Sequence, residues 1–362
     1  MTVVLEKVSK VVAGTPHIRD VSITLLPGSI NVLLGPTLAG KTSLMRLLAG
    51  LDVPTAGRVL VDGKDVTGVE VRKRSVAMVY QQFINYPAMT VYENIASPLR
   101  VRGAPKTEID ARVRDAAKLM RLEPYLQRTP LSLSGGQQQR TAIARALVKG
   151  ADLVLLDEPL ANLDYKLREE LRAELPKIFG GSKAIFVYAT TEPSEALLLG
   201  GNTATLHQGA ITQYGPTVDV YRSPHDRRTA EVFSDPPMNF LSVTVDAGGI
   251  KTASGETIAA SGTLAGLPSG HYQLGFRPSN VYLSAANGAA VPMRGSVAVS
   301  EITGSESFIH IDTSAGRWIA LTPGVRDVEP GQPIEVFLDP ARFFVFASDG
   351  GLVRAPQRAT AT

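Results

Sequence analysis

The sequence predicts an α/β domain built on a mixed sheet, followed by a smaller β-rich domain. Three observations support this prediction. Residues 29–34 form a short apolar run that leads through a glycine-bounded loop into a helical run, and residues 153–158 form a second apolar run that ends in two acids. Beyond residue 240, short runs of valine, isoleucine and phenylalanine are separated by glycine and proline. A chain of 362 residues is long enough for two domains.

The composition excludes several classes of function. Lysine and arginine outnumber aspartate and glutamate by three (37 against 34), and no dense basic stretch occurs, so charge does not indicate a nucleic-acid partner. The chain has no cysteine, which excludes disulfides, thiolate catalysis and cysteine-bound zinc and fits a reducing cytoplasm. The five histidines are scattered singly, so a histidine metal site is not expected.

A membrane-spanning segment is not expected either. No apolar run approaches the roughly 18 to 20 residues that a helix needs to cross a bilayer. The N-terminus, MTVVLEKVSK, has neither a basic leader nor a cleavage site. Any contact with a membrane is therefore expected to be peripheral.

The first elements are expected to be strands. Residues 3–8 and 21–25 are rich in β-branched side chains, and residues 14–16 supply a turn between them. After the first helix, short valine-rich runs lead to a strand at residues 76–80. Gln81 follows directly after that strand, where a polar amide would ordinarily be only a solvated loop residue.

The segment between the apolar strand 29–34 and a helix over residues 41–49 has the composition of a phosphate-binding loop. Its residues are Gly35, Pro36, Thr37, Leu38, Ala39, Gly40, Lys41, Thr42 and Ser43. Gly35 and Gly40 allow backbone N–H groups to converge on phosphate oxygens, and Lys41 adds a positive charge. The Thr42 hydroxyl can ligate magnesium. We therefore expect nucleotide binding here; the alternative is a glycine turn before a helix with no ligand.

A helical subdomain is expected over about residues 83–150. One apolar helix face within it is formed by Ile109, Val113, Ala116, Ala117 and Met120. Ser134, Gly135, Gly136 and Gln137 come at the start of a further helical run. Because free N–H groups and the positive end of the helix dipole point outward at such a start, this segment is a second candidate anion site.

The apolar strand 153–158 ends in Asp157 and Glu158. A buried parallel strand places such acids at the carboxyl edge of its sheet, where open α/β sheets bind ligands. We expect Asp157 to bind magnesium, usually through water, and Glu158 to be the base that polarises the water attacking a γ-phosphate. The alternative is a pair of exposed acids in a loop. A helix marked by Leu167, Leu171 and Leu175 and a buried strand at residues 184–189 complete most of the sheet.

These motifs together resemble the ATP-binding-cassette (ABC) transporter ATPases. The phosphate loop, SGGQ at residues 134–137, LLDEP and LANLD at residues 160–164 follow in that family's order. The resemblance implies ATP and Mg²⁺ as cofactors, and a head-to-tail dimer in which each ATP lies between one chain's phosphate loop and the other chain's signature at residues 134–137. It also implies that Gln81 is the Q-loop glutamine, which senses the γ-phosphate, is a candidate magnesium ligand and contacts the transmembrane partner. Asp164 falls in the D-loop.

A narrower resemblance covers nearly the whole chain. INYPAMTVYENI at residues 84–95, PPMNFL at 236–241, GFRP at 275–278 and the ending GQPIEVFLDPARFFVF look like the carbohydrate-uptake branch, which includes maltose and glycerol-phosphate importer ATPases. This implies an ABC nucleotide-binding domain over residues 1–235 and an OB-like regulatory domain over residues 236–362. It implies two transmembrane permease subunits, an extracytoplasmic substrate-binding protein, a place at the cytoplasmic face of the inner membrane and no nucleic acid. The N-terminal half resembles polyol or glycerol importers.

One departure from the family concerns the switch histidine. The strand that begins at residue 184 leads into VYATTEPSEA, so Thr191 stands at the position of that histidine. A threonine hydroxyl donates one neutral hydrogen bond, but it cannot supply an imidazolium or orient the attacking water as a histidine ring does. The alternative is that Thr191 caps the following helix, with Pro193 in its first turn.

Two more departures affect the nucleotide pocket. Val12 stands where the family stacks an aromatic side chain on adenine, so a contribution of about 1 to 3 kcal/mol is expected to be missing. Leu38 and Ala39 replace the usual glycine and small polar residue of the phosphate loop. We expect a stiffer loop as a result.

Two hypotheses about assembly follow. In the first, the chain pairs with a different, fully equipped ATPase, so that its own site is slow while Ser134 and Gly136 complete the partner's fast site. In the second, it pairs with itself and hydrolyses ATP with Glu158 and no switch histidine. We favour the first, because all three departures fall on the same composite site.

Two other classes of function remain as alternatives. A soluble cassette ATPase acting on nucleic acid or ribosomes would be expected to carry tandem cassettes or a coiled-coil insertion, and the sequence has neither. A regulatory subunit that binds nucleotide without hydrolysing it is the other alternative, but the retained Glu158 argues against complete inactivity. The transported substrate is chosen by the partner subunits and is not specified by this sequence.

Overall fold

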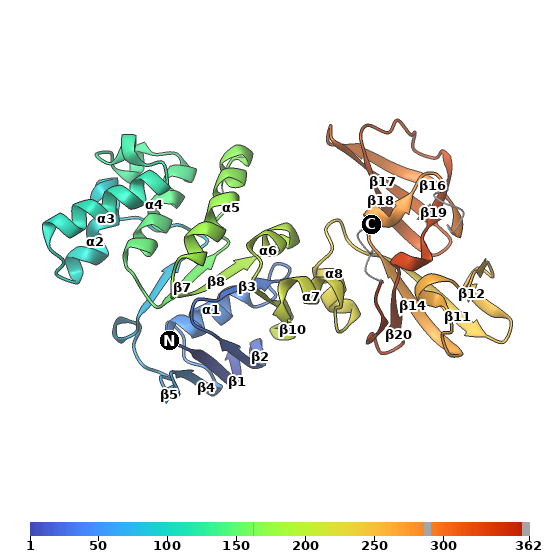
Figure 1. The fold of residues 1–362 in the computed structure, drawn as a ribbon, viewed down its shortest axis with the longest axis horizontal. Coiled ribbons are helices and arrows are strands. Elements are labelled where there is room, and N and C mark those ends of the chain that lie inside the picture. The colour runs from blue at the N-terminus through green and yellow to red at the C-terminus, as the bar shows by residue number, and fades with distance from the viewer. Residues whose placement is uncertain (162, 286–290, 357–362) are drawn as a thin grey trace. The chain divides into compact units, whose positions relative to one another are not determined.

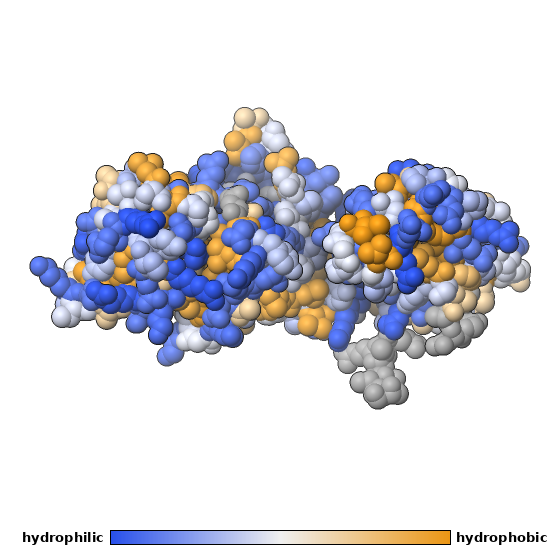
Figure 2. All heavy atoms as spheres, turned by 90° about the horizontal axis from the view of Figure 1, so that it is seen from above, coloured by the Kyte–Doolittle hydropathy of each residue, from blue (hydrophilic) through white to orange (hydrophobic). Residues whose placement is uncertain are grey.

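The computed structural model describes residues 1–161, 163–285 and 291–356 (Figure 1). The chain divides into two compact units, Met1–Val218 and Asp219–Thr362. Figure 2 shows hydrophilic side chains over much of the visible surface, with hydrophobic ones gathered in separate patches among them. Within the described part of the chain, no helix is long and apolar enough to cross a membrane.

The first unit contains a four-stranded antiparallel sheet and a six-stranded mixed sheet. The four-stranded sheet has the order β2-β1-β4-β5 and consists of β1 (Val3–Val12), β2 (Thr15–Leu25), β4 (Ala56–Val61) and β5 (Lys64–Asp65). The six-stranded sheet has the order β10-β9-β3-β8-β7-β6 and consists of β3 (Ile30–Leu34), β6 (Val76–Val79), β7 (Leu153–Asp157), β8 (Ile185–Thr190), β9 (Asn202–His207) and β10 (Ala210–Pro216). Pairing is parallel from β9 to β6, and only β10 runs antiparallel to its neighbour. The predicted mixed α/β sheet is confirmed.

The helices of this unit follow the predicted pattern. They are α1 (Lys41–Ala49), α2 (Val91–Val101), α3 (Lys106–Leu119), α4 (Gly135–Val148), α5 (Tyr165–Gly180) and α6 (Pro193–Leu199), with short 3₁₀ segments at Val71–Lys73, Glu123–Tyr125 and Pro130–Ser132. The next helix, α7 (Thr217–Arg222), begins in this unit and ends in the second. The helices α2, α3 and α4 pack on one another and lie together in Figure 1. The apolar face predicted for the subdomain is buried, including Ile109 and Val113 of α3.

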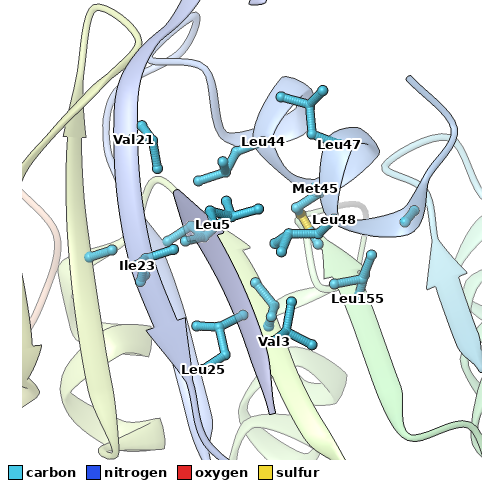
Figure 3. Packing of buried hydrophobic residues seen from close by; sticks show 14 of the residues in the cluster. Val3, Leu5, Val21, Ile23, Leu25, Leu44, Met45, Leu47, Leu48 and Leu155 are labelled. Atoms are coloured by element: carbon cyan, nitrogen blue, oxygen red, sulfur yellow. The ribbon is translucent and has the colours of Figure 1, made fainter. Parts of the chain in front are cut away.

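The core beneath the phosphate loop joins α1 to both sheets. Leu44 and Leu48 of α1 point toward Leu5 of β1 in Figure 3, and these side chains are buried, as are those of Leu47 and Val3. Their spacing along α1 places them on one face of the helix. This packing holds the first turn of α1 rigidly at the end of β3, so the loop between them has fixed ends.

The N-terminal hairpin differs from the sequence-based expectation. The turn lies at Ala13 and Gly14, both with positive φ (48° and 82°), and Thr15 and Pro16 already belong to β2. A two-residue turn with both φ values positive matches the twist of a hairpin, so the strands continue farther than their β-branched runs indicate.

The second unit consists of two antiparallel sheets around one core. The sheet of order β13-β12-β11-β14-β20-β21 is formed by β11 (Asn239–Asp246), β12 (Gly249–Thr252), β13 (Thr257–Ile258), β14 (Gly270–Phe276), β20 (Phe344–Ala347) and β21 (Leu352–Arg354). The sheet of order β15-β19-β16-β17-β18 is formed by β15 (Val281–Tyr282), β16 (Val291–Ile302), β17 (Glu306–Thr313), β18 (Gly316–Pro323) and β19 (Pro333–Leu338). Buried residues from both sheets form one cluster, in which Phe276 packs edge-on against Trp318. The predicted β-rich C-terminal domain is confirmed.

The division between the units falls between Val218 and Asp219, whereas the sequence-based boundary follows residue 235. The difference arises from the helix α8 (Arg227–Val232), which packs on the C-terminal sheet. Its Arg227 donates to Gln273 Oε1 at 2.6 Å, and the guanidinium lies 4.0 Å from the centre of the Phe240 ring. Helical periodicity alone could not indicate which unit this helix joins.

Candidate nucleotide-binding site

The predicted site residues follow strands that are neighbours in the mixed sheet. The strands β3, β6, β7 and β8 run parallel and end at Leu34, Val79, Asp157 and Thr190. Carboxyl ends of parallel strands meet at one edge of a sheet. The phosphate loop, Gln81, Glu158 and Thr191 therefore lie along the same edge, although they are far apart in the sequence.

The phosphate loop is held closely against the rest of the unit. Gly40, with a φ of 105°, precedes the first residue of α1, and a Cβ atom there would lie 2.8 Å from the backbone oxygen of His17. The Lys41 ammonium donates to the carbonyl oxygens of Gly35 and Pro36 at 2.8 and 3.1 Å. Burial lowers the pKa of Lys41, and the neighbouring Glu158 carboxylate opposes that shift. The lysine is thus fixed at the loop, where it can meet a phosphate.

Glu158 joins two other predicted residues. Its Oε1 lies 3.4 Å from Lys41 Nζ, and its Oε2 accepts a hydrogen bond from Gln81 Nε2 at 2.9 Å. The side chain of Glu158 is 19% exposed, so the carboxylate is open to water on one side. A partly exposed carboxylate beside a phosphate-binding lysine has the placement that a base needs in order to polarise a water molecule.

Asp157 and Thr42 have the chemistry of a magnesium site. Asp157 is buried, its carboxylate is hydrogen-bonded to Thr42, and burial raises the pKa of this carboxyl. Hydroxyl and carboxylate oxygens are ligands that suit Mg²⁺. In the described part of the chain, no three acidic, histidine or cysteine side chains gather into a metal site. The residues fit an ion that takes its other ligands from water and phosphate, as Mg²⁺ usually does in nucleotide sites.

Thr191 does not cap the following helix, so that interpretation was wrong. The residue that precedes α6 is Glu192, and Pro193 is the first helical residue, as expected. The Glu192 N–H donates to Thr190 Oγ1 at 3.0 Å. The Thr191 side chain between them is exposed at the sheet edge. Glu192 also forms ion pairs with Arg168 at 3.1 Å and Arg172 at 2.5 Å, both on α5. These bonds fix the backbone on either side of Thr191.

The signature segment begins α4 as predicted. Ser134 is the N-cap: its hydroxyl accepts from the Gln137 N–H at 3.3 Å, while Gln137 Oε1 accepts from the Ser134 N–H at 3.0 Å. This capping box satisfies only part of the helix N-terminus, so the N–H groups of Gly135 and Gly136 remain available to an anion. Among the described residues, no hydrogen bond or ion pair joins this segment to the phosphate loop. The two predicted anion sites are therefore separate within one chain.

Asp164 serves as the N-cap of α5. Its Oδ1 accepts from the Leu167 N–H at 3.0 Å. Asn162, in the middle of the predicted D-loop segment, lies outside the described residues. The same helix carries Arg168 and Arg172, so the D-loop and the segment that holds Thr191 are tied to one element.

The rim of the site contains a residue that sequence reasoning missed. Nδ1 of His17 lies 3.3 Å from Oγ of Ser43, in the first turn of α1. Val12 is half-exposed on the same hairpin, and Leu38 is 95% exposed with a φ of 66°. The position of His17 depends on an irregularity in the pairing of β1 with β2, which no sequence spacing reveals.

Comparisons with known proteins agree with this geometry. The sequence matches the model of the ABC transporter family over residues 18–161 and that of the TOBE domain over residues 274–346. The chain is 36% identical to the sn-glycerol-3-phosphate import ATP-binding protein UgpC of Paracoccus denitrificans, over 95% of this chain and 96% of that protein. It is 34% identical to the trehalose/maltose import ATP-binding protein MalK of Thermococcus litoralis, over 96% of this chain and 98% of that protein.

A solved structure resembles the first unit. It is the dimer of an ATP-binding cassette in a post-hydrolysis state, bound to ADP and phosphate, which matches with a TM-score of 0.54 and 29% identity. The match covers 59% of this chain and 98% of the cassette. The fold prediction, a phosphate-loop cassette followed by an OB-like domain, is confirmed.

Proposed function

The chain belongs to the ABC transporter family, among the ATP-binding proteins of import systems, and from this premise we propose how its site residues bind and hydrolyse Mg-ATP. The observation that carries the proposal is the convergence of Lys41, Gln81 and Glu158 at 3.4 and 2.9 Å. These residues come from three different strand ends, and nothing in local structure requires them to meet. Together they place a cation (Lys41), an amide (Gln81) and a base (Glu158) next to one another.

The proposed roles follow from this arrangement. The loop from Gly35 to Ser43 binds the phosphates through its N–H groups, and Lys41 neutralises the β- and γ-phosphates. Thr42 and Asp157 hold the magnesium ion, which neutralises charge on the phosphates when bound. Glu158 polarises the attacking water, and Gln81 positions Glu158 and the ion. Binding must first draw Lys41 away from Glu158, which frees the base.

We propose that the hydrolysis energises the uptake of a carbohydrate or polyol, with glycerol phosphate as the first candidate. The relatives that match over nearly the whole chain are named as importers of glycerol phosphate and of trehalose or maltose. In this proposal the chain binds two transmembrane permease subunits at the cytoplasmic face of the inner membrane. A substrate-binding protein on the other side delivers the solute.

We propose further that the chain pairs with a different ATPase. Thr191 offers no ring at the switch position, Val12 offers no ring to the base, and Leu38 occupies a loop position with a φ of 66°. All three positions belong to the site built on this chain's own phosphate loop, while its signature is intact. Its own site would be the slow one, and Ser134 and Gly136 would complete the fast site of the partner.

The test is the native mass of the transporter, purified from its source membrane through a tag on this chain. One copy of the chain beside a second ATPase supports the asymmetric dimer, and two copies contradict it. Glu158→Gln in the reconstituted transporter tests the hydrolytic role separately. If transport stays unchanged, the chain is a regulatory subunit and the proposed role of Glu158 is wrong.

A further inference from the structure

We propose that Glu195 is a positioning residue for ATP hydrolysis, because its buried carboxylate fixes the end of β8 that holds the backbone of Glu158. This inference rests on the proposed function and adds a residue that acts through other residues rather than on the nucleotide. Three observations carry it: the hydrogen bonds that join the carboxylate to β8, the backbone bonds that join β8 to the site, and the backbone conformation of Glu158.

Glu195 lies in the first turn of α6 and is 4% exposed. Its Oε2 accepts hydrogen bonds from Thr190 Oγ1 at 2.5 Å and from the Tyr188 hydroxyl at 3.0 Å. Tyr188 and Thr190 are two positions apart in β8, so their side chains lie on the same face of the sheet. One carboxylate oxygen therefore binds two side chains at the end of this strand.

The other carboxylate oxygen of Glu195 faces α5. Its Oε1 lies 3.8 Å from Arg172 Nη2, and the same nitrogen lies 2.5 Å from the Glu192 carboxylate. Burial raises the pKa of Glu195, and the hydrogen bond from Thr190 opposes that shift. Because a buried ion pair contributes little to the stability of a fold, stability does not account for this carboxyl. Its effect on the geometry of β8 does.

The end of β8 is bonded to two parts of the site. The Glu158 N–H donates to the Ala189 carbonyl oxygen at 3.0 Å. The Gly35 N–H, where the phosphate loop begins, donates to the Thr190 carbonyl oxygen at 3.4 Å. The phosphate loop is also held at its other end by the packing of α1 in the core. A displacement of the end of β8 is therefore expected to move Glu158 more than the phosphate loop.

Glu158 depends on this support because its backbone conformation is unfavourable. Its φ is 45°, in the left-handed region that residues other than glycine rarely adopt. It directly follows β7, whose last residue, Asp157, pairs with Ala189 of β8. Unfavourable backbone conformations persist only where the surrounding structure imposes them. If the end of β8 shifts, the Glu158 backbone can relax, and its carboxylate leaves the position from which it polarises water.

The experiment measures ATP hydrolysis at the site built on this chain. The transporter is purified from its source membrane through a tag on this chain, with the base of any different partner ATPase replaced. Phosphate release then gives kcat and KM for Glu195→Gln and for Thr190→Val. The glutamine replaces one acceptor oxygen by an NH₂ group, which can neither accept from a hydroxyl nor pair with Arg172. The valine removes the hydroxyl and leaves the carboxylate in place.

Both variants keep the size of the side chain and should lower kcat. We expect a fall of about tenfold in each, because a small misplacement of a catalytic group is enough to slow a reaction to this extent. The KM for ATP should change by less than about twofold, since the phosphate loop and Lys41 remain in place. A merely structural role would lower the melting temperature without this separation of kcat from KM.

A matched control is Thr203→Val in β9, which belongs to the same sheet. Thr203 is buried, and its hydroxyl lies 2.9 Å from that of Thr217 in α7. This variant removes a buried hydroxyl of the same kind, so its melting temperature should fall about as much as that of Thr190→Val. Its kcat and KM should stay those of the wild type. If Thr203→Val lowers kcat as much as Thr190→Val does, the inference is wrong.

A double variant separates positioning from general damage. Glu158→Gln removes the base that Glu195 is proposed to position, so adding Glu195→Gln should lower kcat little further. A further fall of the same size as in the single variant contradicts the inference, as does a wild-type kcat in both single variants. If Glu195→Gln fails to fold, Thr190→Val decides. If Glu158→Gln alone leaves hydrolysis unchanged, the proposed function fails, which is a different outcome.

Discussion

At the scale of a single residue, Asp157 illustrates how a functional side chain can lower the stability of the folded, ligand-free chain. Its carboxyl lies at the end of an apolar strand, 2% exposed, with one hydrogen bond from Thr42. Burial of a carboxylate with so few partners disfavours its charged form. A residue placed in this way is suited to bind a cation, since an ion would provide the missing favourable interaction.

Asp157→Asn is therefore expected to stabilise the ligand-free chain at pH 7. The pKa of Asp157 is raised above its ordinary value of 3.8 by burial. A carboxyl whose pKa is raised in the folded state favours folding at low pH, where it is protonated, and this contribution is lost as the pH rises through the folded-state pKa. At neutral pH the buried, charged carboxylate therefore lowers the free energy of unfolding of the wild type. The gain should shrink as the pH falls toward the ordinary value.

Thermal unfolding between pH 5 and 8, with and without Mg-ADP, checks this expectation. Mg-ADP should raise the melting temperature of the wild type much more than that of the variant, because the variant has lost a magnesium ligand. A variant that is less stable than the wild type at pH 7 would contradict the argument about burial.

Thr191→His should accelerate ATP hydrolysis. The bond from the Glu192 N–H to Thr190 and the ion pairs of Glu192 hold the backbone at this position. A histidine ring placed there could orient the attacking water, and groups that assist such proton movements contribute roughly 10²- to 10⁴-fold. We expect an increase of at least about tenfold in the turnover of the site built on this chain, measured by phosphate release from the reconstituted transporter after the partner ATPase's own base has been removed.

Thr191→Ala is the control for that experiment, and its turnover should match the wild type because the exposed hydroxyl has no role to lose. Equal rates for Thr191→His and the wild type would show that this position does not limit hydrolysis.

At the scale of an element, α4 depends on its capping box. Ser134→Ala removes the hydroxyl that accepts from the Gln137 N–H. Loss of an N-cap costs about 1 kcal/mol, which corresponds to a fall of about 2 to 4 °C in melting temperature for a domain of this size. Ser134→Thr keeps an oxygen in place and should lose much less. Differential scanning calorimetry of the two variants checks the difference, and equal losses would contradict a capping role.

The regular elements were largely predictable, since their causes are local. The helix α1 begins and ends where its leucine spacing and Gly50 place it, and β7 corresponds to its apolar run. The parallel sheet then brings the predicted residues to one edge. The contacts among them were not predictable: the ion pair of Lys41 with Glu158 depends on rotamers at two strand ends. The bulge at His17 depends on the register of a hairpin, which the turn at Ala13 and Gly14 sets.

At the scale of the whole molecule, the division at residue 218 has a measurable consequence. Arg277 Nη2 donates to the Tyr221 carbonyl oxygen at 2.9 Å, and His225 accepts from the Leu352 N–H at 2.9 Å. Residues 219–235 therefore complete the C-terminal unit. A fragment of residues 219–362 should melt several degrees higher than a fragment of residues 236–362, by about 2 to 4 °C for each kcal/mol lost. Equal melting temperatures would support a domain boundary after residue 235 instead.

The turn at Gly209 also limits how this chain can vary in length. Hairpin turns are usually the places where related proteins gain or lose residues. The turn of Asp62 and Gly63 between β4 and β5 is of that kind, since a Cβ atom on Gly63 would meet nothing within 4 Å and the turn's hydrogen bonds, from Asp62 to Thr2 and back, do not involve the phosphate loop. The turn between β9 and β10 should not accept extra residues. The Gly209 N–H donates to the Ala39 carbonyl oxygen in the phosphate loop at 2.9 Å, and the Gly209 carbonyl oxygen accepts from the Arg19 N–H of β2 at 2.8 Å. In a library of random insertions, transport-competent clones should therefore be found at residue 63 and be missing at residue 209.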